Sequence, residues 1–497
     1  MKNILFLSLA FLLSFNSVKT QDAALFREAA NAALEAFDVP GFSVGIIKDG
    51  EIIMSEGFGT RTYGKEEKVD GNTLFAIASN TKAFTATALA KLDAENVISL
   101  SDPVRKYLPY YEVYDEYVSN HMMVRDLLCH RSGLGTFSGD AIWFKSEQSV
   151  EETLKRLQYL PQAYEWRAGY GYSNLSVITG GEVIKAATGK TWAEYVKENF
   201  FDPLGMDRTQ TSVTPLQKMD NVATPHITRN NNQAISYVNW DNMGAAGGII
   251  SSSNDMLKWI ETQINGGTYQ DKEIFPSAAQ GQTWKPHNPL GGSKTFTSAG
   301  LGWFLTNLDG HRIVSHGGGY DGMYSQVKMA PDDQLGVVIL TNSMTGLSGS
   351  LTNFIINTYL GRDTEGWLEK AVERQEKSTI SWNERRENRE KTRVLDTKPT
   401  VLMEAYTGTY SDPLFGDIEI VLNGEQLELH FPTSPALNAT LTHWHYDTWK
   451  INWNETHAWF DFGTLQFVID NQRTVKKLKF DVPNDDIFFY EIEAVKE

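Results

Sequence analysis

The sequence predicts two folded regions: a longer one of mixed helices and strands, and a shorter one built of strands alone. In the longer region two apolar runs flank Asp49–Gly50, a dipeptide typical of tight hairpins. In the shorter region apolar and polar residues alternate on both sides of Asn423–Gly424, which predicts a hairpin with a type I′ turn. At about 150 residues per domain, a chain of 497 residues has room for both regions.

Residues 1–20 have the features of a secretory signal. Lys2 supplies a positive start, and an apolar run follows from Ile4 to Phe15. This run is too short to span a bilayer, which takes about 20 apolar residues, and no cysteine follows it to carry a lipid anchor. We therefore expect cleavage near Thr20–Gln21 and a secreted protein without a membrane span, as would suit a bacterial periplasm.

The rest of the chain divides where its composition changes. Asp22–Phe37 has apolar residues at helical spacing, and Gly336–Leu340 is typical of a buried strand. Charged residues dominate from Asp363 to about Thr400 and predict a solvated linker helix. We therefore expect a mixed region over 21–360, a charged helical linker over 361–400 and a small all-β domain, a barrel or sandwich, over 401–497.

The overall charge argues against nucleic acid as a partner. Asp and Glu number 62 against 45 Lys and Arg, a formal net charge of −17, whereas nucleic-acid-binding surfaces are basic. Cys129 is the single cysteine, which excludes an intrachain disulfide and a cysteine-based zinc site. The sequence leaves the oligomeric state open.

Ser79-Asn80-Thr81-Lys82 opens a predicted helix and is the first motif with chemical content. Residues three apart share a helix face, so Lys82 can reach Ser79, and a nearby ammonium favours deprotonation of a hydroxyl. The motif alone is weak, because most such pairs lie on ordinary surfaces. The same spacing occurs at Ser325 and Lys328 in a predicted strand, where residues three apart face opposite sides and cannot pair.

Tyr172-Ser173-Asn174 stands just before a second predicted helix, which Gly189 closes. A Tyr oxygen beside a Lys can act as a general base, because positive charge lowers its pKa. The alternative is that Tyr172 only caps the entry to the helix.

His316 is followed by three glycines, Gly317, Gly318 and Gly319, after the apolar pair Ile313–Val314. Glycines let a substrate approach a strand closely and leave backbone N–H groups free to stabilise an oxyanion. The alternative is a structural histidine.

These three motifs, in this order, resemble the serine β-lactamase and penicillin-binding superfamily. The sequence is most similar to the class C β-lactamase-related hydrolases (peptidase family S12), which include esterases, D-aminopeptidases and D-peptidases. The likeness runs from about residue 24 to 360, and residues 443–448 resemble the lipocalin-like C-terminal domain of some of these hydrolases. Further matching segments are Thr73–Ala78, Val124–Leu134, Pro203–Met206 and Ala246–Gly248.

The resemblance implies an α+β fold of the β-lactamase/transpeptidase type. In this fold a central antiparallel sheet carries flanking helices, which we expect on one face, and an all-helical lobe stands beside it. The active site lies between the sheet and the lobe. A small lipocalin-like β-barrel would follow.

The resemblance also implies a role for each motif residue. Ser79 would be the acylated nucleophile, with Lys82 and Tyr172 sharing proton transfer. Asn174 would orient Lys82 and a substrate amide. The N–H groups of Ser79 and Gly319 would form the oxyanion hole. Hydrolysis of a small-molecule, peptide or ester substrate would need no metal and no cofactor.

One position departs from the β-lactamases. His316 stands where they carry a lysine, and a histidine is only partly charged at neutral pH. We therefore expect an esterase, D-aminopeptidase or D-peptidase rather than an efficient β-lactamase. The alternative is a penicillin-binding sensor or binding protein that acylates without turnover.

Several other patterns are weaker. Ser43 lies in a Gly-x-Ser-x-Gly pattern that runs into a hairpin, and Gly317–Gly322 matches a dinucleotide fingerprint that no helix follows. His443 and His445 share one side of a predicted strand, where a structural role is favoured over a metal site; Cys129 is expected to be buried and inert.

The C-terminal domain contains none of the three motifs, so we expect it to be unnecessary for acylation. A loop from this domain is nevertheless expected to cover the cleft. Asp412 and Asp417 are the acidic candidates for binding a free amine. Four tryptophans lie within sixteen positions of one another: Trp444, Trp449, Trp453 and Trp459. We expect some of them to pack the core of this domain and a few to cover the cleft of the larger region, because pockets often form at domain interfaces.

Overall fold

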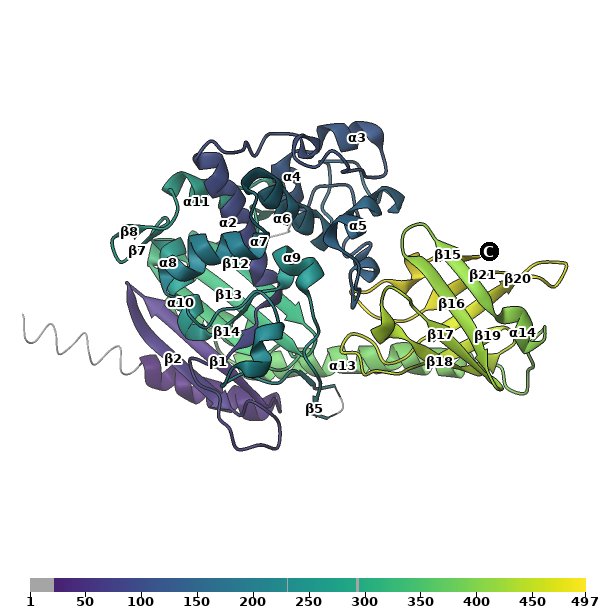
Figure 1. The fold of residues 1–497 in the computed structure, drawn as a ribbon. Helices are drawn as coiled ribbons and strands as arrows, with labels where there is room; N and C mark the ends of the chain where they lie inside the picture. The colour runs from purple at the N-terminus through teal and green to yellow at the C-terminus, as the bar shows by residue number, and fades with distance from the viewer. Residues whose placement is uncertain (1–21, 230, 292–294) are drawn as a thin grey trace, which may run out of the picture.

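The computed structural model describes residues 22–229, 231–291 and 295–497, so the predicted signal segment 1–20 lies outside the described residues. Figure 1 shows a larger body with an eight-stranded sheet and a helical lobe, and a β-barrel at its side. None of the helices in these ranges is long and apolar enough to cross a membrane.

The central sheet is antiparallel throughout, in the order β2-β1-β14-β13-β12-β11-β10-β9. Asp49 and Gly50, both with positive φ, form the two-residue turn between β1 and β2, as a type I′ hairpin requires. The strands are β1 (Gly41–Lys48), β2 (Glu51–Gly59), β9 (Asn288–Pro289), β10 (Thr297–Ala299), β11 (Phe304–Leu308), β12 (His311–Tyr320), β13 (Met323–Ala330) and β14 (Leu335–Thr341).

Helices cover both faces of this sheet, so the expectation of helices on one face is wrong. Alternate residues of β14 point to opposite sides, and all seven are buried. Val337 and Ile339 pack with the helix over residues 22–36 and with α12 (Leu347–Tyr359), whereas Val338 and Leu340 pack on the side of α10 (Ser253–Ile264). A strand without a polar side cannot leave one face in water.

The helical lobe stands above the sheet in Figure 1 and surrounds α2 (Thr81–Ala94). This helix is buried on nearly all sides, and its buried residues include Thr81, Thr85, Thr87 and Lys82 as well as apolar side chains. The other helices of this region are α3 (Glu116–His121), α4 (Val124–Leu128), α5 (Val150–Lys155), α6 (Asn174–Thr188), α7 (Trp192–Val196), α8 (Asp202–Leu204), α9 (Gly244–Gly247) and α11 (Ser277–Thr283).

The C-terminal strands close into an eight-stranded antiparallel barrel. The hairpin predicted around Asn423–Gly424 forms, but the central residues of its turn are Gly424 and Glu425, and only Gly424 has positive φ. That is the pattern of a type II′ turn rather than type I′. The strands are β15 (Gly408–Asp412), β16 (Gly416–Asn423), β17 (Gln426–His430), β18 (Ala439–His445), β19 (Thr448–Trp453), β20 (Thr464–Ile469), β21 (Val475–Asp481) and β22 (Val495–Lys496), with α14 (Met403–Tyr406) before them.

Helix α13 (Trp367–Lys391) runs from the larger body along the barrel (Figure 1). It is exposed as predicted, with Ala371 its single buried residue. Its arginines are nevertheless not all solvated: Arg385 pairs with Asp485 and Arg389 with Asp481, both on the barrel side. These bidentate ion pairs hold the helix against the barrel.

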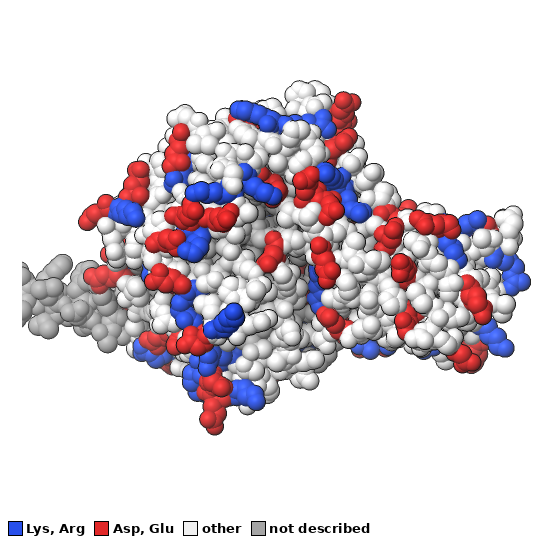
Figure 2. Space-filling view, viewed as in Figure 1, with Lys and Arg blue, Asp and Glu red and all other residues white. Residues whose placement is uncertain are grey.

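Figure 2 shows acidic and basic side chains interspersed over the same view of the molecule. No extended basic surface appears on this face among the described residues.

Candidate active site

Ser79 lies on a strained turn between β3 (Phe75–Ala76) and α2. Ala78 has a φ of +46°, a left-handed conformation that is uncommon for a residue with a side chain. Ser79 follows in a single 3-10 turn and is partly exposed, while the residues from Leu74 to Ala78 are buried. The turn thus presents one hydroxyl to the surface from an otherwise buried segment.

Lys82 reaches Ser79 across one helical turn, as the spacing predicts. Its ammonium nitrogen lies 2.9 Å from Ser79 Oγ, 2.7 Å from Asn174 Oδ1 and 2.8 Å from the carbonyl oxygen of Ala246. The side chain is completely buried. Burial lowers the pKa of Lys82 to about 7, although the nearby Asp140 carboxylate opposes the shift. Near neutral pH, Lys82 therefore exists in both the charged and the neutral form.

Asp140 stands behind this pair and was not predicted from the sequence. The Asn174 amide nitrogen donates to Asp140 Oδ2 at 2.6 Å, and the Trp143 indole donates to Oδ1 at 2.8 Å. Burial raises the pKa of Asp140 to about 8. Asn174 therefore bridges Lys82 and Asp140, and no local motif marks the aspartate.

Tyr172 approaches the same serine. The Lys82 nitrogen lies 4.9 Å from the centre of its ring, and its hydroxyl is within hydrogen-bonding reach of Ser79. Burial raises the pKa of Tyr172 far above its ordinary value, and the Ser79 interaction offsets only part of this. The expected lowering is therefore wrong: Tyr172 is a neutral phenol, and Lys82 is the group with a pKa suited to a base.

His130 supports Tyr172 and was also missed. The two rings stack with centroids 4.3 Å apart, and His130 Nδ1 accepts a hydrogen bond from the Ser173 N–H at 3.3 Å. Burial holds the pKa of His130 well below its ordinary value, so the ring is neutral.

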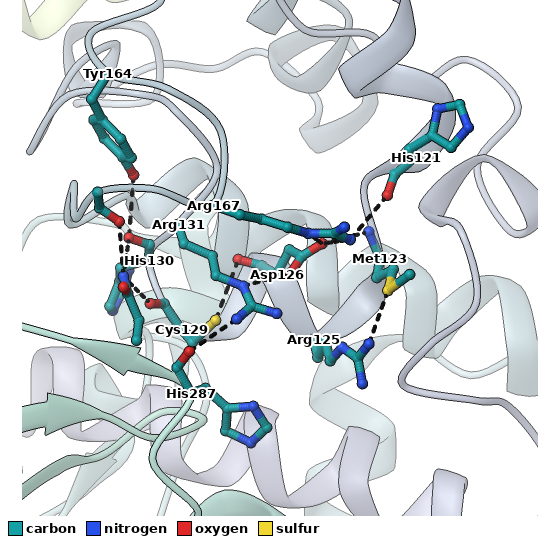
Figure 3. Close-up of polar contacts among 12 residues, drawn as sticks. His121, Met123, Arg125, Asp126, Cys129, His130, Arg131, Tyr164, Arg167 and His287 are labelled. Carbon is teal, nitrogen blue, oxygen red and sulfur yellow. Dashed lines mark hydrogen bonds and ion pairs between the residues drawn. The ribbon is translucent and has the colours of Figure 1, made fainter.

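The chain around His130 is fixed by a buried ion-pair cluster (Figure 3). Arg131 and Arg167 converge on the fully buried Asp126 at 2.7 and 2.6 Å, and the Tyr164 hydroxyl donates to the carbonyl of His130 at 3.2 Å. Two charge-assisted contacts satisfy a carboxylate that would otherwise be costly to bury. The cluster thus anchors the segment on which Tyr172 rests.

The glycines after His316 lie on a free strand edge. Strand β11 pairs with β12 only as far as Ser315, and the β12–β13 hairpin closes at Tyr320 and Met323. Because hydrogen-bonding direction alternates along an antiparallel ladder, Gly317 and Gly319 point their backbone groups away from β13. A Cβ on Gly318 would lie 2.2 Å from the carbonyl oxygen of Ile77 and 3.0 Å from the Ser79 nitrogen. This close approach brings the free edge, including the Gly319 N–H, next to the turn that carries Ser79.

His316 itself is buried and uncharged. Its Nδ1 lies 2.6 Å from the carbonyl oxygen of Gly317, so Nδ1 carries the proton and Nε2 is an acceptor. Burial lowers the pKa of His316 to about 3, and the Lys82 charge adds to the effect. The position therefore holds no cation at neutral pH.

A cavity of about 600 Å³ opens above Ser79. The motif residues Ser79, Tyr172, Asn174 and His316–Gly319 all line it, and among the described lining residues there is no Lys or Arg. The barrel contributes Trp459, Asp486 and Ile487. Aromatic side chains form much of the remaining wall: Phe137, Trp143, Tyr170, Trp240, Phe304 and Tyr324.

The barrel thus covers the cleft as expected, with Trp459 as the one of the four tryptophans that lines the described cavity, but the expected acidic residues do not line it. A Cβ on Gly319 would lie 3.1 Å from the Trp459 ring. Asp412 instead accepts hydrogen bonds from the backbone N–H groups of Leu414, Phe415 and Glu493 within the barrel, and Asp417 accepts one from the Ser411 hydroxyl. Neither aspartate lines the cavity, so neither is the expected amine-binding group.

The weaker patterns have structural roles. Ser43 lies on β1, 2.6 Å from Ser253 Oγ, and Gly317–Gly322 lies in the β12–β13 hairpin. Ser325 lies on β13 and donates to the carbonyl of Ile77 at 2.7 Å, while Lys328 binds Asn353.

The single cysteine and the histidine pair also have structural surroundings. Burial raises the pKa of Cys129 to about 12. His443 Nε2 contacts the carbonyl of Tyr446, and His445 accepts from the Val394 N–H.

Comparison with known proteins agrees with this geometry. The chain is 26% identical over 457 residues to "Unguisins hydrolase ungD" of Aspergillus violaceofuscus, covering 84% of this chain and 79% of that one. It is 27% identical over 319 residues to "Protein flp" of Staphylococcus aureus, covering 62% and 61%. The octameric penicillin-binding protein homologue from Pyrococcus abyssi superposes with a TM-score of 0.61 at 20% identity, covering 95% of this chain and 99% of that chain.

Family models cover both regions. The model described as a domain of unknown function, DUF3471, matches residues 392–496, which include the whole barrel. The model described as Beta-lactamase matches residues 26–356, more than half of the chain. This protein therefore belongs to the beta-lactamase family.

Proposed function

We propose that the protein is a serine hydrolase that works through an acyl-enzyme on Ser79. The observation that carries the proposal is the 2.9 Å contact between Ser79 Oγ and a buried lysine whose pKa is lowered to about 7. A neutral amine at that distance can take the hydroxyl proton at physiological pH. The name of the fungal relative, a hydrolase, supports the reaction class.

The steps follow from the positions of the groups. Neutral Lys82 accepts the Ser79 proton as Oγ attacks the acyl carbon, and the charge that develops on the carbonyl oxygen faces the N–H groups of Ser79 and Gly319. The Tyr172 phenol then donates its proton to the departing alcohol or amine and regains one from the Lys82 ammonium. Water attacks the ester in the reverse sense and releases the acid.

Uncharged or cationic acyl substrates fit this cavity better than anionic ones. The described lining holds no Lys or Arg, and His316 is neutral. Asp486 adds a carboxyl group that would repel a substrate carboxylate once ionised. We therefore propose an esterase, D-aminopeptidase or D-peptidase of the S12 type. We expect weak hydrolysis of cephalosporins, and a kcat/KM of about 10⁶ M⁻¹s⁻¹ or more would contradict this.

A fluorophosphonate probe tests the nucleophile. We expect label on Ser79 alone, located by mass spectrometry of the digested protein; label on Ser43 or Ser325 would overturn the assignment. A panel of D-amino-acid amides, D-peptides and small esters then identifies the acyl group.

The second candidate, a binding protein that acylates without turnover, has a different kinetic signature. It would label at Ser79 and hold a substrate-derived acyl group indefinitely. Release of product beyond one equivalent per protein excludes it.

Export belongs to the proposal as well. Its support is the apolar segment at the N-terminus, and N-terminal sequencing of the protein from its native host tests it. A mature chain that still begins at Met1 would contradict cleavage.

A further inference from the structure

The barrel touches the helical lobe at a point that leads to the catalytic lysine. Glu491, at the end of the short turn Phe489–Glu491, extends from the barrel to the loop that carries Ser138 and Gly139. One carboxylate oxygen accepts from Ser138 Oγ at 2.7 Å, and the other accepts from the Gly139 N–H at 2.7 Å. Each carboxylate oxygen of Glu491 therefore accepts a hydrogen bond from one of two consecutive residues of the same loop.

This loop is held in a strained shape. Gly139 has a φ of +80°, and a Cβ there would lie 2.7 Å from Leu160 and from Leu175. Phe137 also has a positive φ, at 59°. Glycine adopts a positive φ freely, but for a residue with a side chain, such as Phe137, this conformation persists only where surrounding contacts enforce it. The Glu491 carboxylate supplies two contacts, to the two residues that follow Phe137.

Two sets of contacts run from the loop to the reacting groups. The residue after Gly139 is Asp140, which holds Asn174 at 2.6 Å, and Asn174 holds Lys82 at 2.7 Å. On the other side, the Phe137 N–H donates to the carbonyl of Tyr172 at 2.8 Å, and the Tyr172 N–H donates to Thr136 Oγ1 at 3.1 Å. One loop thus positions both proton-transfer residues.

We infer that Glu491 is a positioning residue for catalysis, and that the barrel acts through it on Lys82 and Tyr172. Glu491 does not line the cavity, so it acts without touching substrate. The inference rests on the proposed acyl-enzyme function. It replaces the expectation, drawn from the motifs alone, that residues 401–497 are unnecessary for acylation.

The test compares two barrel carboxylates that both contact the helical lobe. Glu491→Ala removes both loop contacts, and we expect the rate of fluorophosphonate acylation to fall about tenfold, because small misplacements of catalytic groups are costly. Glu491→Gln retains an acceptor for the Gly139 N–H and should recover most of the rate. Glu455→Gln, which removes the charge from the 3.2 Å ion pair of the barrel with Lys145, should leave the rate unchanged.

The pH profile separates positioning from general docking. The titratable groups around Lys82 in the described structure are Asp140, Tyr172, His130 and His316, and burial keeps the last three neutral. A loosened loop admits water, reduces the desolvation of Lys82 and raises its pKa. The rising limb of the acylation profile should therefore move to higher pH in Glu491→Ala and stay in place in Glu455→Gln. With a hydrolysed substrate, kcat should fall more than KM rises.

The inference is overturned if a folded Glu491→Ala protein keeps both the acylation rate and the pH at which that rate rises. It is also overturned if Glu455→Gln loses as much acylation rate as Glu491→Ala. If Glu491→Ala does not fold, Ser138→Ala removes one contact from the loop side, and a rate within experimental error of the unmodified protein overturns the inference there. Absence of Ser79 labelling in the unmodified protein would instead overturn the proposed function.

Discussion

The floor and the roof of the cavity are built differently. The floor comes from the larger region, where the buried Lys82 hydrogen-bonds both to Ser79 and to Asn174. The roof comes from the barrel and consists of Trp459, Asp486 and Ile487, which belong to no motif. From this contrast we expect the floor to set the rate of the reaction and the roof to select which substrates the cavity admits.

Removing floor residues should have the largest effect. We expect Ser79→Ala to lower turnover by on the order of 10⁴-fold or more, and Lys82→Ala by nearly as much, because residues that act as a unit are not additive. Steady-state kinetics with the best ester or amide of the panel measures this. A double variant much slower than either single one would show that the two residues act independently.

The second prediction concerns pH. The base is neutral Lys82, whose pKa is lowered to about 7, so acylation should increase with pH, about tenfold per pH unit below pH 7, and level off above it. The initial rate of probe labelling from pH 5 to 9 gives the profile. A rate that falls as the pH rises through 7 would assign the base to another group.

The roof should have a smaller and different effect. Trp459→Ala removes an aromatic ring from above Gly319, and we expect kcat/KM for small esters to fall about tenfold, mainly through KM, since lost binding common to ground and transition states raises KM alone. Longer acyl groups should be accepted better. Tyr446→Ala, at an exposed barrel tyrosine, is the matched control and should change neither parameter.

The smallest effect is expected at the second Ser-x-x-Lys copy. Ser325 holds the carbonyl of Ile77 and accepts from the Asn80 amide at 2.8 Å, so Ser325→Ala should destabilise the fold by about 1–3 kcal/mol. Thermal unfolding measures this. Labelling at Ser79 should slow by only a few fold, and a loss as great as that of Ser79→Ala would remove the distinction between the two copies.

What the sequence predicted well depends on short-range geometry. Ser79 and Lys82 meet because three residues nearly complete one helical turn, and the two Gly-containing hairpins form because glycine accepts positive φ. In the barrel hairpin the turn is type II′ rather than type I′, so its central residues differ from the predicted ones while the two strands still pair.

What the sequence missed depends on distant contacts. Asp140 binds Asn174 from 34 residues away, and His130 binds the Ser173 N–H from 43 residues away, both from loops without a motif. The sign of the Tyr172 pKa change depends on burial, which no local pattern reports. Asp486 and Ile487 reach the cavity only because the barrel folds back onto the cleft. No local pattern distinguishes them from the acidic loop residues Asp412 and Asp417, which we predicted instead.

The buried lysine also bears on how stable the molecule is. A folded-state pKa near 7, against an ordinary value of 10.5, means that the unfolded chain binds the proton more tightly. The free energy of unfolding therefore decreases as the pH falls from about 10.5 toward 7, by about 1.4 kcal/mol for each pH unit. Below about pH 7 this group causes no further decrease. Lys82→Met would remove this pH dependence and give an inert protein, so the group that makes the site reactive is also one that makes the fold less stable as the pH falls.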